Sequence, residues 1–201
     1  STVYEFTHTL FRETLYEHLA PKERVLLHRR TGLALEELYG DAAPEIASEL
    51  AVHFREGRLF DKAFEYSLAA ARRAKRLYAV QEAIDHFQQA RKHLERVEGT
   101  REQRLVIAEG LADMLSLQAS YDLALAHLER ARDLIEDTAR MPEPLARLCR
   151  KTGMLHERKG AYEEAFAWLE RGLGLLDGDG SLEGARIRLT GGGIHSRQGS
   201  H

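Results

Sequence analysis

The sequence predicts an all-α protein built from repeated helix hairpins, and three observations support this fold class. Ala, Leu, Glu and Arg are abundant, whereas only 4 of the 201 residues are proline, a composition that favours helix over strand. Apolar residues recur at intervals of three and four along most of the chain, which is the period of an amphipathic helix. The third observation is an internal period of 41 residues, which arranges the helices into copies of one unit.

The N-terminal third predicts three helices. Pro21 stands at a plausible first helical position because a helix start tolerates the missing N–H. Gly40 and Asp41 end this second helix, and a third is expected from Pro44 to about Arg55. The apolar stripe of the helix before Pro21 consists of Phe6, Leu10, Leu15 and Leu19.

The following helices are expected at about 60–77 and 79–97, and the next opens on a capping signature. In Thr100-Arg-Glu-Gln103 the Thr hydroxyl and the Gln side chain can each satisfy a free backbone amide. Ser120 and Ser181 are further N-cap candidates, since a Ser side chain accepts a hydrogen bond from an amide of the first turn.

The repeat is clearest in the small residues that open each second helix, Ala83, Ala124 and Ala165, which lie 41 residues apart. Two helices approach to about 8–10 Å only where their contacting side chains are small. We therefore expect these alanines at the seam of each hairpin. Other matching columns are Phe87, Leu128 and Leu169; Ala90, Ala131 and Gly172; Leu94, Ile135 and Leu176; Ala112 and Gly153 of the first helices; and, at the turns, Ala119 with Tyr121 and Gly160 with Tyr162.

These columns resemble the tetratricopeptide repeat, which combines small residues at the helix seams with an aromatic residue at the turn. The resemblance implies a right-handed α-solenoid over residues 43–201, preceded by a short helical junction at 1–42. The period of 41 exceeds the family's usual length of about 34. Ala63 also begins a similar motif only 20 residues before Ala83, so the first helices do not follow the period of 41. The half-unit at Gly192, His195 and Gly199 repeats Gly153, His156 and Gly160 at an offset of 39.

Because the last repeat is unfinished, we expect its end to fray or to contact another chain through its uncapped surface. The sequence also lacks an initiator Met and ends in Gly-Ser-His. Both ends indicate a piece of a longer protein.

The N-terminal segment carries a second resemblance. It is similar to the junction between a winged-helix segment and a helical arm in the bacterial STAND-class signal-transduction ATPases, including those linked to adenylate cyclases and the maltose-activator-like transcription regulators. The resemblance implies that the repeats form the sensor of such a regulator. The residues that carry it are Phe6, His8, Leu10, Arg12, Glu13, Tyr16 and Leu19, then Leu27, His28, Arg29 and Arg30, with Ile46–Phe54 and Phe60–Tyr66 fitting the passage from arm to repeats.

Composition and motifs argue against several function classes. The net charge of −3 gives no basic excess for a phosphate backbone, and residues 1–40 balance five Lys and Arg against six Glu, so direct nucleic-acid binding is not expected. No apolar run reaches the roughly 18–20 residues that span a bilayer, and no signal peptide is recognisable. The single cysteine fits a reducing, cytoplasmic setting.

Catalytic and metal-binding signatures are weak. The only glycine cluster, Gly191–Gly193, lies within a predicted helix without a preceding strand, so packing or chain-end flexibility is favoured over phosphate binding. Cys149 falls in a packing column, which favours a buried, inert thiol over a reactive one. Ser48 and His53 are five residues apart, a spacing that does not bring side chains together on a helix.

The ten histidines include no HExxH pair, although His86 and His127 share a repeat column and could approach each other. Exposed or locally hydrogen-bonded histidines are the commoner outcome. His156 and His195 share an inward-facing column, where they replace the family's aromatic residue. No metal and no cofactor are expected.

The resemblance implies that the first helix of each unit lines a concave groove. Arginines in such a groove could hold a carboxylate or a phosphate through two hydrogen bonds. The alternative is a solvated charged face, in which Glu109 and Asp113 simply pair with neighbouring arginines. The groove candidates are Arg72, Lys75 and Arg76; Glu109 and Asp113; Arg147, Arg150, Met154, Glu157 and Arg158; and Arg186 and Arg197.

The function that these features favour is recognition, not catalysis. We expect a non-catalytic sensor scaffold of a larger bacterial signalling ATPase or transcription regulator, which binds a protein, a peptide segment or a small anionic inducer. Any ATPase activity would lie in an upstream domain. The alternative is a free-standing tetratricopeptide adaptor that scaffolds partner proteins.

Overall fold

The computed structural model describes residues 16–135, 141–176 and 180–198, and all regular structure in these ranges is helical. The all-α prediction is therefore confirmed at the level of fold class. The elements are α2 (Pro21–Tyr39), the 3-10 helix η1 (Gly40–Ile46), α3 (Ala47–Glu56), α4 (Phe60–Arg76), α5 (Val80–Leu94), α6 (Arg101–Leu117), α7 (Tyr121–Asp133), α8 (Pro142–Arg158), α9 (Tyr162–Leu173) and α10 (Leu182–Gln198).

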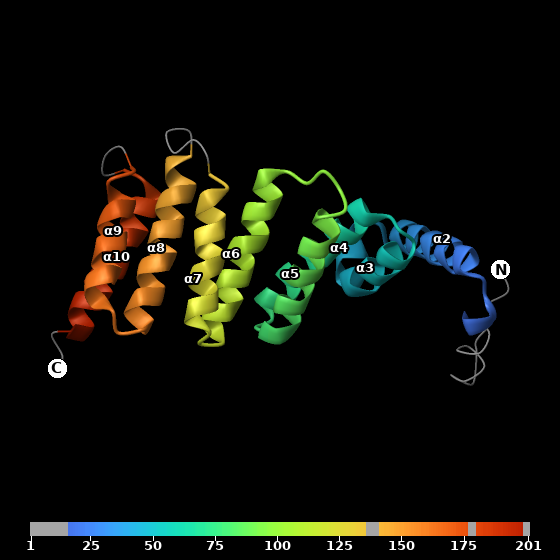
Figure 1. The fold of residues 1–201 in the computed structure, drawn as a ribbon, viewed down its shortest axis with the longest axis horizontal. Helices are drawn as coiled ribbons and strands as arrows, with labels where there is room; N and C mark the ends of the chain where they lie inside the picture. The colour runs from blue at the N-terminus through green and yellow to red at the C-terminus, as the bar shows by residue number, and fades with distance from the viewer. Residues whose placement is uncertain (1–15, 136–140, 177–179, 199–201) are drawn as a thin grey trace.

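The helices form a single elongated row (Figure 1). Each helix from α2 onward packs against the next one along the chain, and α10 also contacts α8. Helices α2 and α10 therefore lie at opposite ends of the molecule. The buried apolar side chains of the described residues form three clusters along this row, in which helices pack against those of the same and adjacent hairpins.

Most of the expected helix ends are confirmed. Pro21 opens α2, and Gly40, with a φ of +49°, follows its last residue. The Thr100 hydroxyl accepts a hydrogen bond from the Gln103 amide at 3.2 Å, and the Gln103 side chain accepts one from the Thr100 amide at 2.8 Å. Ser181 accepts a hydrogen bond from the Gly184 amide at 3.3 Å.

Two expectations about helix starts are wrong. Ser120 precedes α7, but its side chain makes no capping hydrogen bond. Its backbone amide instead donates to the Leu115 carbonyl, which leaves the Ser at the end of a tight turn. Pro44 does not begin an α-helix, because it lies inside η1, and α3 begins at Ala47. A Pro ring fits the tighter 3-10 turn here, whereas the α-helical hydrogen bonds begin only after it.

Four hairpin turns share one backbone geometry. Arg58, Tyr78, Ala119 and Gly160 each adopt a positive φ, between 57° and 77°. The next amide in each turn bonds back to a carbonyl of the preceding helix: Leu59 to Phe54, Ala79 to Ala74, Ser120 to Leu115 and Ala161 to His156, at 2.8–3.0 Å. This six-residue closure terminates a helix through a left-handed residue. The turns are therefore structural copies of one another.

The short spacing between Ala63 and Ala83 now has an explanation. Helix α4 ends the hairpin that begins with α3, and the same helix begins the hairpin that ends with α5. One helix thus serves two adjacent turns, which places the two motifs 20 residues apart instead of 41.

The small residues of the repeat lie where the helices approach most closely. Ala83, Ala124 and Ala165 are completely buried. At the matching position of α8, a methyl group added to Gly153 would lie only 2.9 Å from the Ala165 carbonyl oxygen. The prediction that small side chains form the hairpin seams is confirmed at this pair.

Helix α2 is tied to the rest of the row at two points. Arg29 donates two hydrogen bonds to the Gly57 carbonyl, at 3.1 and 3.2 Å. Glu36 accepts hydrogen bonds from Lys62 at 2.7 Å and from Tyr66 at 2.8 Å, both on α4. The residues before Tyr16 that carry the family resemblance, and Gly199 of the last half-unit, lie outside the described residues. None of the described helices combines the length and the apolar character needed to cross a bilayer.

Candidate functional site

The groove candidates lie on α4, α6, α8 and α10, the first helices of successive hairpins. The structure brings most of them together through ion pairs that join one such helix to the next. Ion pairs between equivalent helices of adjacent hairpins restrict the relative orientation of those hairpins.

Lys151, on α8, lies at the centre of the largest group of ion pairs. Its ammonium group is 3.0 Å from Glu109 and 2.8 Å from Asp113, both on α6. Arg147 donates two hydrogen bonds to Glu109, at 2.8 and 3.1 Å. Lys75, on α4, reaches Asp113 at 2.6 Å. We call these five residues the Lys151 network, and it joins α4, α6 and α8.

The Lys151 network keeps both of its carboxyl groups ionised. Burial alone would raise the pKa of Glu109, but the hydrogen bonds and charges of Arg147 and Lys151 outweigh it and hold the pKa below its usual value. Burial likewise opposes ionisation of Asp113, whose pKa is lowered overall by Lys151 and Lys75. Both carboxylates are thus already neutralised by cations of the chain.

A second group joins α8 to α10. The Glu183 side chain is only 6% exposed and accepts a 2.5 Å hydrogen bond from Arg150. Arg186 reaches the other carboxylate oxygen of Glu183 at 3.4 Å. Arg197 pairs with Glu157 further along the same two helices.

Part of the predicted groove forms a hollow of about 210 Å³. Its lining includes four groove candidates, Lys75, Asp113, Met154 and Arg158. Arg158 donates hydrogen bonds to the carbonyl and the hydroxyl of Ser116, at 3.1 and 2.6 Å. The polar groups around this hollow are therefore held in fixed positions before any ligand arrives.

Arg72 and Arg76 differ from the other candidates. Both are exposed on α4, and neither pairs with any other residue in the part of the chain that the structure describes. They are the cations of the predicted groove that remain available to an outside anion, whereas the others already hold carboxylates or carbonyl groups of the chain.

Lys151 and Glu183 are the site residues that the sequence reasoning missed. A signal for Lys151 exists in the repeat spacing, because opposite charges 38 or 42 residues apart meet across neighbouring hairpins, whereas Glu183 pairs with Arg150 at an offset of 33. Glu109 pairs with Arg147 and Lys151 at these offsets, and Lys75 pairs with Asp113.

The histidine candidates do not converge. His86 contacts the Ser48 hydroxyl at 3.1 Å, whereas His127 lies in a separate hollow beside Arg91 and Arg130. Among the described residues, no group of three or more His, Cys, Asp or Glu side chains could hold a metal ion.

The other residues considered for catalysis are kept apart or buried. Ser48 contacts His86 and not His53, whose ring lies against His28. Cys149 is 1% exposed, and burial raises its pKa, as expected for an inert thiol.

The shared inward column of His156 and His195 holds only in part. His156 is half-buried, but His195 is exposed and stacks on Phe166 with a centroid distance of 4.3 Å. The last helix has no following hairpin in the described residues to cover this ring.

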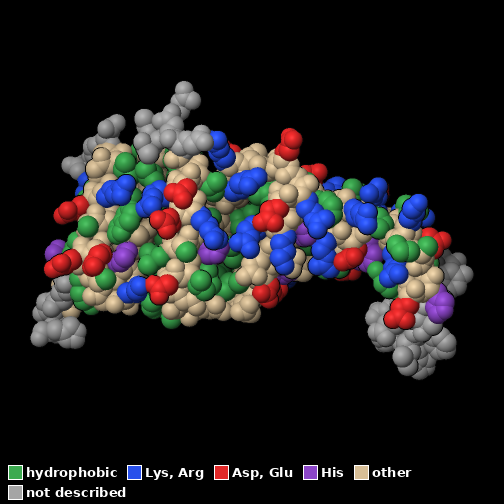
Figure 2. All heavy atoms as spheres, viewed as in Figure 1, with side chains coloured by type: hydrophobic (Ala, Val, Ile, Leu, Met, Phe, Trp, Pro, Cys, Tyr) green, Lys and Arg blue, Asp and Glu red, His purple; other side chains and the backbone are tan. Residues whose placement is uncertain are grey.

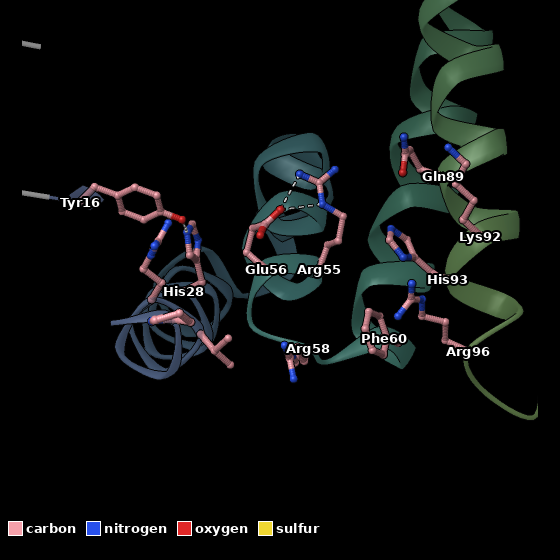
Figure 3. Close-up of a pocket in the computed structure, with 13 residues that line it drawn as sticks. Tyr16, His28, Arg55, Glu56, Arg58, Phe60, Gln89, Lys92, His93 and Arg96 are labelled. Carbon is pink, nitrogen blue, oxygen red and sulfur yellow. Dashed lines mark hydrogen bonds and ion pairs between the residues drawn. The ribbon is translucent and has the colours of Figure 1, made fainter. Parts of the chain in front are cut away.

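A larger hollow of about 590 Å³ lies at the other end of the row, where α2, the turn between α3 and α4, and the end of α5 meet. Figure 3 shows its lining side chains converging from these separate elements. We call it the junction pocket. Its residues are Tyr16, Pro21, Arg24, Val25 and His28; Arg55, Glu56, Arg58 and Phe60; and Gln89, Lys92, His93 and Arg96. The sequence reasoning did not single out this cluster.

The junction pocket is strongly basic. Arg24, Arg55, Arg58, Lys92 and Arg96 line it together with two histidines, against the single carboxylate of Glu56. That carboxylate is already bound by the neighbouring Arg55, at 2.9 and 3.0 Å (Figure 3). Figure 2 shows Lys and Arg side chains gathered on one face over the middle of the row, around α5.

His93 forms the buried floor of the junction pocket, with 4% of its surface exposed. Its ring stacks on Phe60, and Arg96 lies over the Phe60 ring at 5.1 Å from the centroid. Burial lowers the pKa of His93, and the charges of Arg55, Arg96 and Lys92 lower it further. The pocket therefore disfavours an additional positive charge.

Comparisons with known proteins identify the fold but no family. No family model matches the sequence. A curated relative, "Uncharacterized protein R02095" of Rhizobium meliloti (strain 1021), is 34% identical over 89 residues, which are 44% of this chain and 9% of the relative. The chain therefore matches only a small part of that protein's length. Among solved structures, BtubC (BKLC) from P. vanneervenii superposes with a TM-score of 0.60 over 90% of this chain and 85% of that one, at 14% identity.

Proposed function

We propose that this chain is a recognition scaffold, a right-handed α-solenoid of tetratricopeptide-like hairpins whose face on α4, α6, α8 and α10 binds a partner. The observation that supports it most is the shared geometry of the four turns at Arg58, Tyr78, Ala119 and Gly160. Copies of one hairpin stacked in a row present equivalent helices side by side, and such rows bind partners along an extended concave surface.

The ion pairs give this face a fixed shape. The Lys151 network joins α4 to α6 and α8, and the Arg150–Glu183 pair joins α8 to α10. A preordered surface binds more tightly because less conformational freedom is lost on association. The exposed Arg72 and Arg76 would then attract an acidic peptide segment or a small anionic inducer, and the hollow beside Met154 would take an apolar side chain.

We further propose that the scaffold is the sensor and arm of a larger STAND-type regulator. The sequence resemblance supports this assignment, and the matched segment, which is 9% of its curated relative, is compatible with one part of a long protein. For a regulator of this kind, partner binding must favour the active over the resting arrangement, because equal affinity for both would switch nothing.

The experiment begins with the coding sequence upstream of residue 1 and uses the natural full-length protein. If a phosphate-binding loop precedes this chain, we expect extract of the source organism to stimulate ATP hydrolysis. Replacing Arg72→Glu together with Arg76→Glu should abolish that stimulation. The matched control is Arg30→Glu with Arg171→Glu, two exposed arginines on α2 and α9 outside the described hollows.

The outcomes separate the alternatives. A protein without a phosphate-binding loop that still binds a partner through Arg72 and Arg76 would be an adaptor. Stimulation that is equal in both variants would contradict the proposed face. Arg150→Glu with Arg158→Glu is a poorer test, because Arg150 holds the buried Glu183 and its reversal would disrupt the packing of α10.

A further inference from the structure

The junction pocket contains positive charge that the chain itself does not neutralise. In the Lys151 network each of the three cations faces a carboxylate at 3.0 Å or less. In the junction pocket the one carboxylate, Glu56, is held by Arg55. Lys92 and Arg58 form no ion pair within the described residues.

The cations reach the pocket from different elements, which makes their convergence a property of the fold. Arg24 comes from α2, Arg58 from the left-handed turn before α4, Lys92 from the last turn of α5, and Arg96 from the turn that follows α5. Figure 3 shows Arg58 and Arg96 near Phe60, and Lys92 beyond His93, beside Gln89. Positive charges that line one hollow without carboxylates of their own favour the entry of an anion.

The other walls of the pocket suit an organic group. Tyr16, Val25 and Phe60 contribute apolar and aromatic surface, and Gln89 contributes an amide. The volume of about 590 Å³ falls within the range of small-molecule sites, about 300–1,000 Å³. Inorganic phosphate alone would leave most of this space empty.

We propose that the junction pocket binds a phosphate-bearing small molecule, with Lys92 and Arg96 among the lining cations that attract its phosphoryl group. Guanidinium and ammonium groups bind phosphate oxygens through short, charge-assisted hydrogen bonds. The binding site lies outside the face proposed for partner recognition and joins α2 to the end of α5. A ligand there would fix the angle between the arm helix and the first hairpins.

A small molecule fits the pocket better than a nucleic acid does. Nucleic-acid surfaces carry their cations along a stripe that follows the backbone, whereas these cations surround one hollow. The net charge of −3 for the whole chain would also repel a long polyanion.

The test is isothermal titration calorimetry of the 201-residue chain with pyrophosphate, AMP, adenosine and a short single-stranded oligonucleotide. We expect one site for pyrophosphate and for AMP and none for adenosine. Lys92→Gln with Arg96→Gln should weaken the affinities for pyrophosphate and for AMP about tenfold or more, because the loss of one charged hydrogen bond reduces the free energy of binding by an amount of that order. Both side chains are exposed, and circular dichroism checks that the variant is folded.

The matched control is Arg30→Gln with Arg171→Gln, which removes two exposed charges elsewhere and should leave the affinities within about twofold, as for surface sites without direct contact. Equal weakening by both variants would overturn the proposal. So would binding of adenosine as strong as that of AMP, absence of binding at millimolar pyrophosphate and AMP, or a preference for the oligonucleotide over both.

Discussion

The α-carbon of Gly153 faces the carbonyl oxygen of Ala165 so closely that a methyl group on Gly153 would lie 2.9 Å from that oxygen. This contact joins α8 to α9 at the column where the sequence repeat places small residues. The preference for small side chains there is therefore a consequence of the distance between two backbones.

Gly153→Ala should destabilise the protein by about 1–3 kcal/mol, because the added methyl group forces two packed helices apart. The control is Gly192→Ala, where an added methyl group meets nothing within 4 Å. That change should stabilise by about 0.5–1 kcal/mol through helix propensity alone. Urea denaturation measures both, and a neutral or stabilising Gly153→Ala would contradict the close packing of this hairpin.

Lys151→Met should destabilise the chain by about 1–3 kcal/mol, because it removes the cation shared by the partly buried carboxylates of Glu109 and Asp113 and leaves each with a single cationic partner, Arg147 or Lys75. The control is Lys159→Met, since Lys159 pairs with the exposed Asp122, and such surface pairs contribute about 0–1 kcal/mol. Equal effects in urea denaturation would show that the Lys151 network does not hold the helices together.

The sequence period predicts the hairpins because their seams depend on residue size. Ala83, Ala124 and Ala165 could be recognised without knowing their contacts, since each is a small, completely buried residue at the same place in its unit. The start of α3 could not be predicted in the same way. Pro44 is compatible with both an α-helical and a 3-10 start, and the contacts of η1 with α2 and α4 decide between them.

The ion pairs were only half predictable. The sequence raised the alternative that Glu109 and Asp113 pair with neighbouring cations, and the structure shows this pairing. That Lys151 is the partner they share could not be predicted, because it depends on the stagger between α6 and α8. The sequence does not predict the junction pocket, because the pocket depends on the angle at which α2 docks near Gly57. No short motif encodes that angle.

The stability of the chain should fall as the pH decreases below about 6.5, the usual pKa of histidine. The pKa values of His53, His93 and His127 are all lowered, in each case first by burial. A group with a lowered folded-state pKa takes up its proton more readily when unfolded, so protonation favours unfolding between the unfolded and folded pKa values.

His93→Phe should reduce this dependence by up to about 1.4 kcal/mol per pH unit, the contribution of one proton. The measurement is urea denaturation at several pH values between about 5 and 8, a range that brackets the histidine pKa. The unsubstituted chain is the reference, and an equal slope in His93→Phe would contradict the burial of His93.

Cys149 should react with a thiol reagent only when the protein opens. Its side chain is 1% exposed and its pKa is raised by burial, and both features suppress the thiolate that reacts. We expect labelling at neutral pH to be slow without denaturant and to accelerate as urea populates the unfolded state. Rapid and complete labelling of the native chain would place Cys149 at the surface.

The claim that the hairpins are copies of one structure is tested most directly by exchanging the residues at two equivalent turns. Ala119 and Gly160 have φ values of 58° and 77°, a left-handed conformation that is unfavourable for Ala and unstrained for Gly. The measurement is the free energy of unfolding of Ala119→Gly and of Gly160→Ala, each compared with the unsubstituted chain. The account predicts effects of opposite sign and about 1 kcal/mol or less in size, with Ala119→Gly stabilising and Gly160→Ala destabilising. A loss of stability in Ala119→Gly, or no loss in Gly160→Ala, would contradict it.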